Sequence, residues 1–285
     1  MTGLLLAVAA SIGWGTTGML AGRVSRRLPP LHVAMALEWS GLAMIALVLL
    51  VMHPAPGSGT DLLIALGAGL AGALGNVLIY AALSVGSMGL VAPIAASGAA
   101  IPVIAFGVAE GDRPAALAIA GMVLALIGGA TVARAPGRAT RPGLGLALMA
   151  ALAYALYFAL LDLAADGGAL WATTTSRAMA AVFLTVLVVA LGHRIGRIER
   201  RGLVRAMPIG LLDALATLAF VLATTRGLVS LVAVIACLYP ITTAALAYAL
   251  LEERLGKWQA LGAALAVAGV AMIVATAWPR VRTPA

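Results

Sequence analysis

Three ionisable side chains lie inside long apolar runs of the sequence: Glu38, Arg177 and Asp213. A charge at the centre of a helix in hydrocarbon costs about 2.5–3.5 kcal/mol on insertion scales, so such residues are often functional. Glu38 and Arg177 are candidates for charges at a cavity or gate; the alternative is a structural charge that backbone carbonyls or the membrane interface solvate. Asp213 is a candidate proton-coupling carboxylate, or else an acid near the start of its helix.

A second set of candidates is aromatic or polar and also falls well inside apolar runs. A buried phenol or indole needs a hydrogen-bond partner, which a water-filled cavity would supply. Such a cavity would hold an amphipathic solute of amino-acid size; plain packing is the alternative. The set is Trp14, Asn76, Tyr80, Ser97, Tyr154, Tyr157 and Tyr239.

Proline and glycine mark positions where helices bend or approach closely. Pro102 and Pro240 interrupt helical hydrogen bonding, as hinges or as fixed kinks. Glycines at positions 67, 69, 72 and 75 give one face of a predicted helix only small residues, which favours close helix packing.

Motifs for enzymatic chemistry are absent from the sequence. The three histidines lack metal-ligand spacing, and no glycine-rich phosphate loop with its lysine is present. The single cysteine, Cys237, fits a small core residue. We therefore expect no catalytic residues, no metal and no cofactor. The net charge of +8 indicates no nucleic-acid partner, because the arginines sit between apolar runs and form no basic helix.

Composition requires a bilayer around these candidates. The chain of 285 residues is 63% hydrophobic and 10% charged, whereas a soluble domain carries about 25% charged residues. Apolar runs of about 20 residues are long enough to cross a membrane as helices. We read the first run as a membrane span and not as a signal peptide, since it lacks a basic start. The predicted spans are 2–21, 31–52, 61–83, 88–109, 114–134, 143–164, 170–191, 204–225, 228–250 and 257–277.

The sequence repeats itself. The stretch Gly89-Leu90-Val91 recurs as Gly227-Leu228-Val229, and Pro102 matches Pro240 at the same offset of 138 residues. We expect an all-α membrane protein with one five-helix repeat over 1–136 and a second over 137–285. Because five is odd, the second repeat enters the membrane inverted, as in secondary transporters.

The distribution of lysine and arginine predicts the orientation. Thirteen of these residues fall in the odd-numbered loops and four on the other side. We therefore expect cytoplasmic odd loops and both termini outside. Glu38 and Arg177 each lie about seven residues into spans of opposite direction, so we expect them near opposite faces and not paired with each other.

The order and spacing of several short motifs resemble the ten-helix, EamA-type branch of the drug/metabolite transporter superfamily. The resemblance covers nearly the whole chain and is strongest in the last hairpin. One departure is Glu38, which stands where the family often has an arginine. The motifs are Gly13-Trp14-Gly15, Asn76, Tyr80-Ala81-Ala82-Leu83, Pro93, Pro102, Arg177, Pro240, Leu251-Glu252-Glu253-Arg254, Trp258, Gly262 and Gly269.

This resemblance implies a multi-pass transporter of the bacterial cytoplasmic membrane that works by alternating access. Within the branch the chain looks most like exporters of neutral and aromatic amino acids (the YddG type). The expected partners are such a small solute and the lipid bilayer, with a monomer expected and a dimer as the alternative. A proton-coupled antiporter of cationic drugs is the second hypothesis; it would need Glu38 or Asp213 at mid-membrane.

Overall fold

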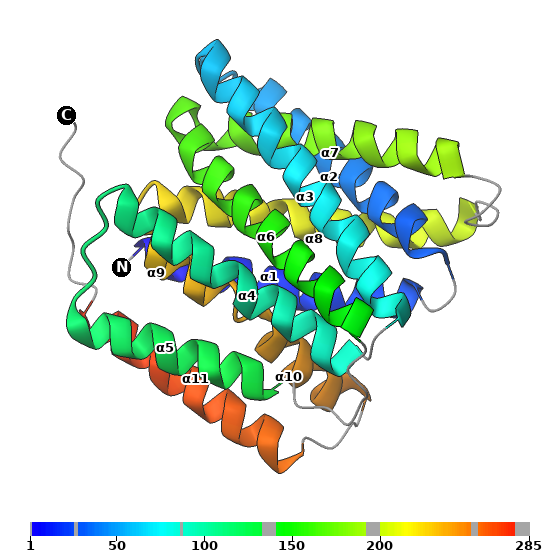
Figure 1. Ribbon diagram of the computed structural model, residues 1–285. Helices are drawn as coiled ribbons and strands as arrows, with labels where there is room; N and C mark the ends of the chain where they lie inside the picture. The colour runs from blue at the N-terminus through cyan, green and yellow to red at the C-terminus, as the bar shows by residue number, and fades with distance from the viewer. Residues whose placement is uncertain are drawn as a thin grey trace.

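The computed structural model describes residues 2–25, 28–85, 88–132, 141–191, 200–251 and 256–276. Over these residues all regular secondary structure is helical, and the helices form one bundle (Figure 1). The elements are α1 (Thr2–Ser25), α2 (Pro30–Met52), α3 (Gly59–Val85), α4 (Met88–Ala109), α5 (Ala116–Val132), α6 (Arg141–Ala164), the 3₁₀ turn η1 (Ala165–Gly167), α7 (Ala169–Leu191), α8 (Arg200–Thr224), α9 (Val229–Ala236), α10 (Tyr239–Leu251) and α11 (Lys257–Thr276).

These helices confirm the ten predicted spans. Helix ends and predicted span ends differ by at most four residues. Among the described residues, six helices are long and apolar enough to cross a membrane, and shorter apolar helices lie in the other four spans. Large apolar side chains point outward from the bundle, including Leu63 at 69% and Val189 at 77% exposure, as a lipid-facing surface requires.

The ninth span is broken in the middle, which the sequence analysis left as one continuous run. α9 ends at Ala236, a turn follows at Cys237 and Leu238, and α10 begins at Tyr239. Pro240 is the second residue of α10, where its missing N–H is not needed. The repeat-matched Pro102 lies instead within the continuous α4. The two prolines therefore have different local structures.

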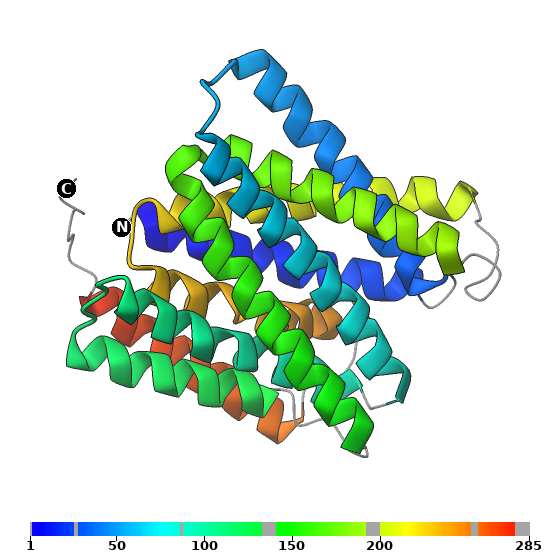
Figure 2. The ribbon, with the colours of Figure 1, turned by 45° about the horizontal axis from the view of Figure 1, so that its top comes forward.

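The two halves of the chain interleave. α1 packs on α8 and its counterpart α6 packs on α3; α2 packs on α8 and α7 on α3. α2 also contacts its own counterpart α7, and α5 contacts α11 along one edge of the bundle (Figure 2). Each of these contacts between a helix of one half and a helix of the other is repeated by the two counterpart helices, as a two-fold relation between the halves requires. The main interior of the protein is thus an interface between them.

One end of the bundle, here called the N-terminal face, contains the start of α1 and the connections 53–58, 110–115, 165–168 and 225–228 (Figure 1). Two hydrogen bonds join connections of the first half to helices of the second half. The Asp112 carboxylate accepts a hydrogen bond from Ser230 N at 2.9 Å, and Trp171 Nε1 donates to Pro54 O at 3.1 Å. α1 begins at this face and α6 ends there, so equivalent helices run in opposite directions.

Glycines let the helices that carry the candidate residues approach closely. A Cβ on Gly69 of α3 would overlap the carbonyl oxygen of Ser176 in α7. A Cβ on Gly75 would lie 2.7 Å from the ring of Tyr154, and one on Gly72 would lie 3.0 Å from the ring of Tyr157. The small face predicted for this helix is confirmed as a packing surface, with two tyrosines of α6 lying on it.

Candidate functional site

A cavity of about 220 Å³ lies between the two halves of the bundle. Its walls come from α1, α2, α3 and α4 of the first half and from α6, α7, α8 and α10 of the second. The lining residues that carry polar groups or rings are Trp14, Thr17, Glu38, Asn76, Tyr154, Tyr157, Phe158, Ser176, Arg177, Asp213, Thr217 and Tyr239.

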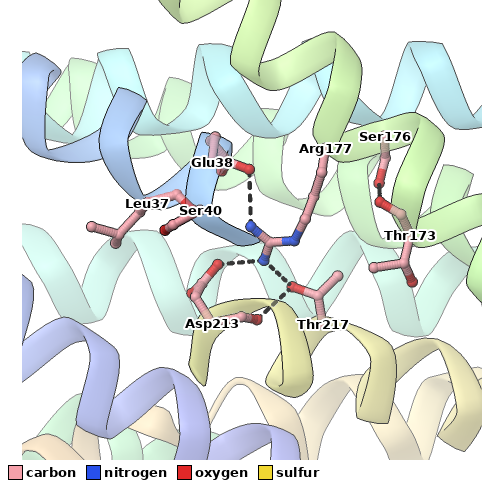
Figure 3. Close-up of polar contacts among 8 residues, drawn as sticks. All are labelled: Leu37, Glu38, Ser40, Thr173, Ser176, Arg177, Asp213 and Thr217. Carbon is pink, nitrogen blue, oxygen red and sulfur yellow. Dashed lines mark hydrogen bonds and ion pairs between the residues drawn. The ribbon is translucent and has the colours of Figure 1, made fainter. Parts of the chain in front are cut away.

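Arg177 holds two carboxylates at one wall of the cavity (Figure 3). Its Nη1 lies 3.0 Å from Glu38 Oε2, and its Nη2 lies 2.5 Å from Asp213 Oδ2. Nη2 also donates to Thr217 Oγ1 at 2.9 Å, and Thr217 in turn donates to the Asp213 carbonyl oxygen at 3.0 Å. The forked guanidinium suits this arrangement because its donors diverge in one plane. One network therefore joins α2, α7 and α8.

The expectation that Glu38 and Arg177 would not pair was wrong. Each is the ninth residue of a 23-residue helix. At a rise of 1.5 Å per residue, each lies within about 5 Å of its helix midpoint. Although α2 and α7 run in opposite directions, the long arginine side chain spans the remaining distance.

The interpretation of Asp213 as an acid near a helix start was also wrong. α8 begins at Arg200, earlier than predicted, so Asp213 is the fourteenth of 25 residues. It lies in the middle of the bundle with its carboxylate on Arg177. The last basic residues before the apolar run were assigned to a loop, but they lie in an additional turn of helix at the start of α8.

Two glycines create the space for the guanidinium. A Cβ on Gly41 of α2 would lie 2.8 Å from Arg177 Nη1 and 2.8 Å from the carbonyl oxygen of Gly210 in α8. A Cβ on Gly210 would overlap Ser40 Oγ. Close contact of α2 and α8 at this pair brings Glu38 and Asp213 to either side of Arg177.

Aromatic rings form another part of the site. Trp14 lies 5.4 Å from Phe158 and 5.6 Å from Phe220, centroid to centroid, in tilted geometries that favour ring–ring contact. Tyr154 Oη donates to Asn76 Oδ1 at 2.9 Å and so joins α6 to α3 at the cavity wall. The site thus combines a charged wall with an aromatic wall, which suits a solute that is itself part polar and part apolar.

The sequence profile of the EamA-like transporter family matches this chain twice, over residues 1–134 and 141–275. The chain belongs to the EamA-like transporter family. It is an all-helical, multi-pass membrane protein built from two EamA halves, and it is a transporter and not an enzyme.

One solved structure, described as "Crystal structure of protein", is similar to this EamA-family fold with a TM-score of 0.82. It is 18% identical in sequence and covers 95% of this chain and 98% of its own. At that identity the likeness concerns the fold alone. No curated protein matches the sequence.

The EamA fold brings most of the predicted solute-binding residues to one place. Trp14, Asn76, Tyr154, Tyr157 and Tyr239 all line the cavity. The side chains of Tyr80 and Ser97 lie outside the described part of the structure. Pro102 and Pro240 lie off the cavity lining; Pro240 directly follows Tyr239.

Sequence reasoning missed Thr217, Ser176 and Phe158 as cavity residues. Thr217 could have been found, because it follows Asp213 by four residues and so shares its helix face. Ser176 and Phe158 gave no such signal. Each is the sequence neighbour of a selected residue, Arg177 or Tyr157, and adjacent residues do not share a helix face. Among the described residues, no group of three histidine, cysteine or acidic side chains could hold a metal ion.

Proposed function

We propose that this EamA-family protein exports small metabolites, with neutral and aromatic amino acids as the first candidate class, as in exporters of the YddG type. The observation that carries the proposal is the cavity between the two halves, lined by both. Its volume of about 220 Å³ is below the range of about 300–1,000 Å³ for pockets that hold drug-sized ligands. A solute of amino-acid size therefore fits better than a large drug.

Alternating access is supported by the dense packing of the described residues between the cavity and the N-terminal face. The largest buried cluster lies between the cavity and the N-terminal face, and every residue of α9 from Val229 to Ala236 is buried. With the orientation that the arginines predict, this face is outside the cell. We therefore assign this conformation as closed toward the outside. The proposed location is the bacterial cytoplasmic membrane, and the proposed working unit is a monomer.

In this proposal the aromatic and amide side chains hold the solute, and the prolines permit the conformational change. Trp14, Tyr157 and Tyr239 contact the apolar part of the solute, while Asn76 and Tyr154 offer hydrogen bonds. Tyr80 and Ser97 keep the same proposed role from the sequence pattern. Pro240 lies beside the break between α9 and α10 and is the stronger hinge candidate; Pro102 is proposed as its counterpart in α4.

A second candidate function is proton-coupled antiport of cationic drugs. The observation that favours it is the position of two carboxylates, Glu38 and Asp213, on the cavity lining at mid-bundle. A proton and a cationic solute could compete for such acids. α1 contains no acid, which counts against this candidate, although α2 and α8 supply two carboxylates to the cavity.

Counterflow in proteoliposomes tests the first candidate. Vesicles preloaded with neutral amino acids receive labelled phenylalanine, threonine or methionine at equal internal and external pH. Accumulation above protein-free vesicles is expected, because exchange through a facilitative carrier needs no ion gradient. No accumulation at equal pH, with uptake of an ethidium-type cation after a pH step, would instead support the antiporter.

A further inference from the structure

The charged wall of the cavity carries one more carboxylate than it has cations. Glu38 and Asp213 face the single guanidinium of Arg177, and Arg177 is the one cationic residue of the described cavity lining. Two carboxylates and one guanidinium leave a formal charge of −1. An unbalanced charge in a low-dielectric site is costly unless a proton or a ligand of opposite charge neutralises it.

All three residues line the cavity, and the carboxylates are more exposed than the guanidinium. The Arg177 side chain is 3% exposed, whereas Glu38 is 14% and Asp213 is 21% exposed. Each carboxylate uses one oxygen for Arg177, Oε2 of Glu38 and Oδ2 of Asp213. Among the described residues, no protein donor is recorded for the other oxygen of either one. The wall therefore presents hydrogen-bond acceptors to whatever occupies the cavity.

A third polar group of the same cavity also lacks a partner. Thr17 of α1 lines the cavity and is 5% exposed, and its buried hydroxyl has no hydrogen-bond partner among the described residues. Buried hydroxyls in native proteins are nearly always hydrogen-bonded. A ligand whose polar group reached this hydroxyl would satisfy it.

We propose that Glu38 and Asp213 bind a protonated amine of the transported solute, with Arg177 positioning both carboxylates. An ammonium group supplies three N–H donors and one positive charge. It would balance the surplus charge and use the free carboxylate oxygens, while the aromatic wall takes the apolar part of the same solute. The proposal rests on the proposed transport function and defines its solute class as small amphipathic amines.

The same geometry makes a free carboxylate on the solute unnecessary. Both Nη atoms of the guanidinium that would bind one already donate to Glu38, Asp213 and Thr217, whereas the buried Nε has no recorded partner among the described residues. In this proposal the site binds an amino acid through its amine. The corresponding amine without a carboxylate should therefore bind at least as well. A matching acid without an amine should be repelled by the surplus negative charge.

A series of three matched ligands separates these cases. Binding of labelled phenylalanine to the purified full-length protein is measured in detergent, with unlabelled 2-phenylethylamine and 3-phenylpropionate as competitors. The amine is expected to compete at least as strongly as phenylalanine itself, and the acid not to compete at equal concentration. Equal competition by the acid, or none by the amine, would overturn the proposal. Direct binding of labelled 2-phenylethylamine is measured in parallel, so that the amine arm has its own readout.

Variants then locate the amine site. Glu38→Gln and Asp213→Asn each remove the surplus charge and leave one carboxylate for Arg177, so the guanidinium remains paired. Each should weaken 2-phenylethylamine binding by about tenfold or more, the value of a lost charge-assisted hydrogen bond. The control is Asp166→Asn, which removes an acid that is exposed and off the cavity. Unchanged amine affinity in both cavity variants, with normal size-exclusion profiles, would contradict the assignment.

The outcomes also separate this proposal from the transport function on which it rests. Phenylalanine counterflow without 2-phenylethylamine binding would reject the amine site and leave the transport function intact. Binding of 2-phenylethylamine without counterflow of any amino acid would support the amine site and reject amino acids as the transported class. Failure of both measurements would reject both.

Discussion

Asp112 and Ser230 join the two halves of the protein at its N-terminal face. The Asp112 carboxylate accepts a hydrogen bond of 2.9 Å from the backbone N–H of Ser230, 118 residues later in the chain. Asp112 is 4% exposed, and Ser230 is the second residue of α9. An acid of the first half therefore caps one free N–H group at the start of a helix of the second half.

Replacing Asp112 with Ala should destabilise the protein. The start of α9 would be left buried without its cap, at a cost of about 0.5–2 kcal/mol. Thermal unfolding of the detergent-solubilised protein measures this as a lower Tm. Asp166→Ala, an exposed acid on the 3₁₀ turn η1, is the control and should leave the Tm unchanged. An equal Tm for both variants would show that the cap contributes nothing.

Gly69→Ala should impair folding, whereas Gly67→Ala should be tolerated. A Cβ on Gly69 overlaps the carbonyl oxygen of Ser176, and backbone atoms cannot move aside cheaply. A Cβ on Gly67 would lie 3.4 Å from Leu160 Cδ1, which is ordinary contact. Overpacking of this kind costs about 1–3 kcal/mol. The comparison is made by folded yield and Tm, and similar values for the two alanine variants would argue against the tight α3–α7 contact.

Arg177→Ala should destabilise the folded protein more than the removal of all three charges together. Removing the guanidinium leaves Glu38 and Asp213 as neighbouring unpaired acids, and breaking such a buried pair costs about 3–5 kcal/mol. Combining Arg177→Met with Glu38→Gln and Asp213→Asn removes the charges as a set and should restore much of the folded yield in size-exclusion chromatography. If the triple variant is no better folded than Arg177→Ala, the destabilisation does not come from uncompensated charge.

Pro240→Ala should slow transport while solute binding persists. An alanine N–H at position 240 could bond to the Ala236 carbonyl oxygen and stiffen the break between α9 and α10. The counterflow rate for phenylalanine should fall about tenfold, the effect of roughly 1.4 kcal/mol on a barrier, with an unchanged Kd. Pro208→Ala, inside α8 and exposed, is the matched control. Wild-type rates for Pro240→Ala would exclude a hinge at this proline.

Most of the fold follows from the sequence because the bilayer imposes a length on each helix. Apolar runs of about 20 residues ended by charged or glycine-rich turns define the spans to within four residues. The break at Cys237 was not predictable from Pro240 alone, since the equivalent Pro102 leaves α4 continuous. Local backbone chemistry is similar at both prolines, and the surrounding packing decides the outcome.

The candidate site was only half predictable. Residue type and depth in the spans pointed to Trp14, Tyr154 and Tyr157, which do line the cavity. The pairing of Arg177 with two acids was missed because it depends on the close contact of Gly41 with Gly210, which joins helices far apart in the sequence. Such tertiary contacts leave no periodic signal in one chain.

The central claim is that solute passes through the cavity between the two halves. Gly18 lines this cavity, and a Cβ there would lie 3.7 Å from Thr243 Oγ1, its closest recorded neighbour. Gly18→Phe should therefore fill the cavity without disturbing the backbone. Gly145→Phe is the control, because Gly145 is exposed on α6, off the cavity, with nothing within 4 Å of an added Cβ.

Both variants are reconstituted at equal amounts of folded protein, and phenylalanine counterflow is measured at equal pH. The account predicts that Gly18→Phe abolishes counterflow and that Gly145→Phe retains it. Wild-type counterflow by a correctly folded Gly18→Phe protein would show that the solute does not use this cavity.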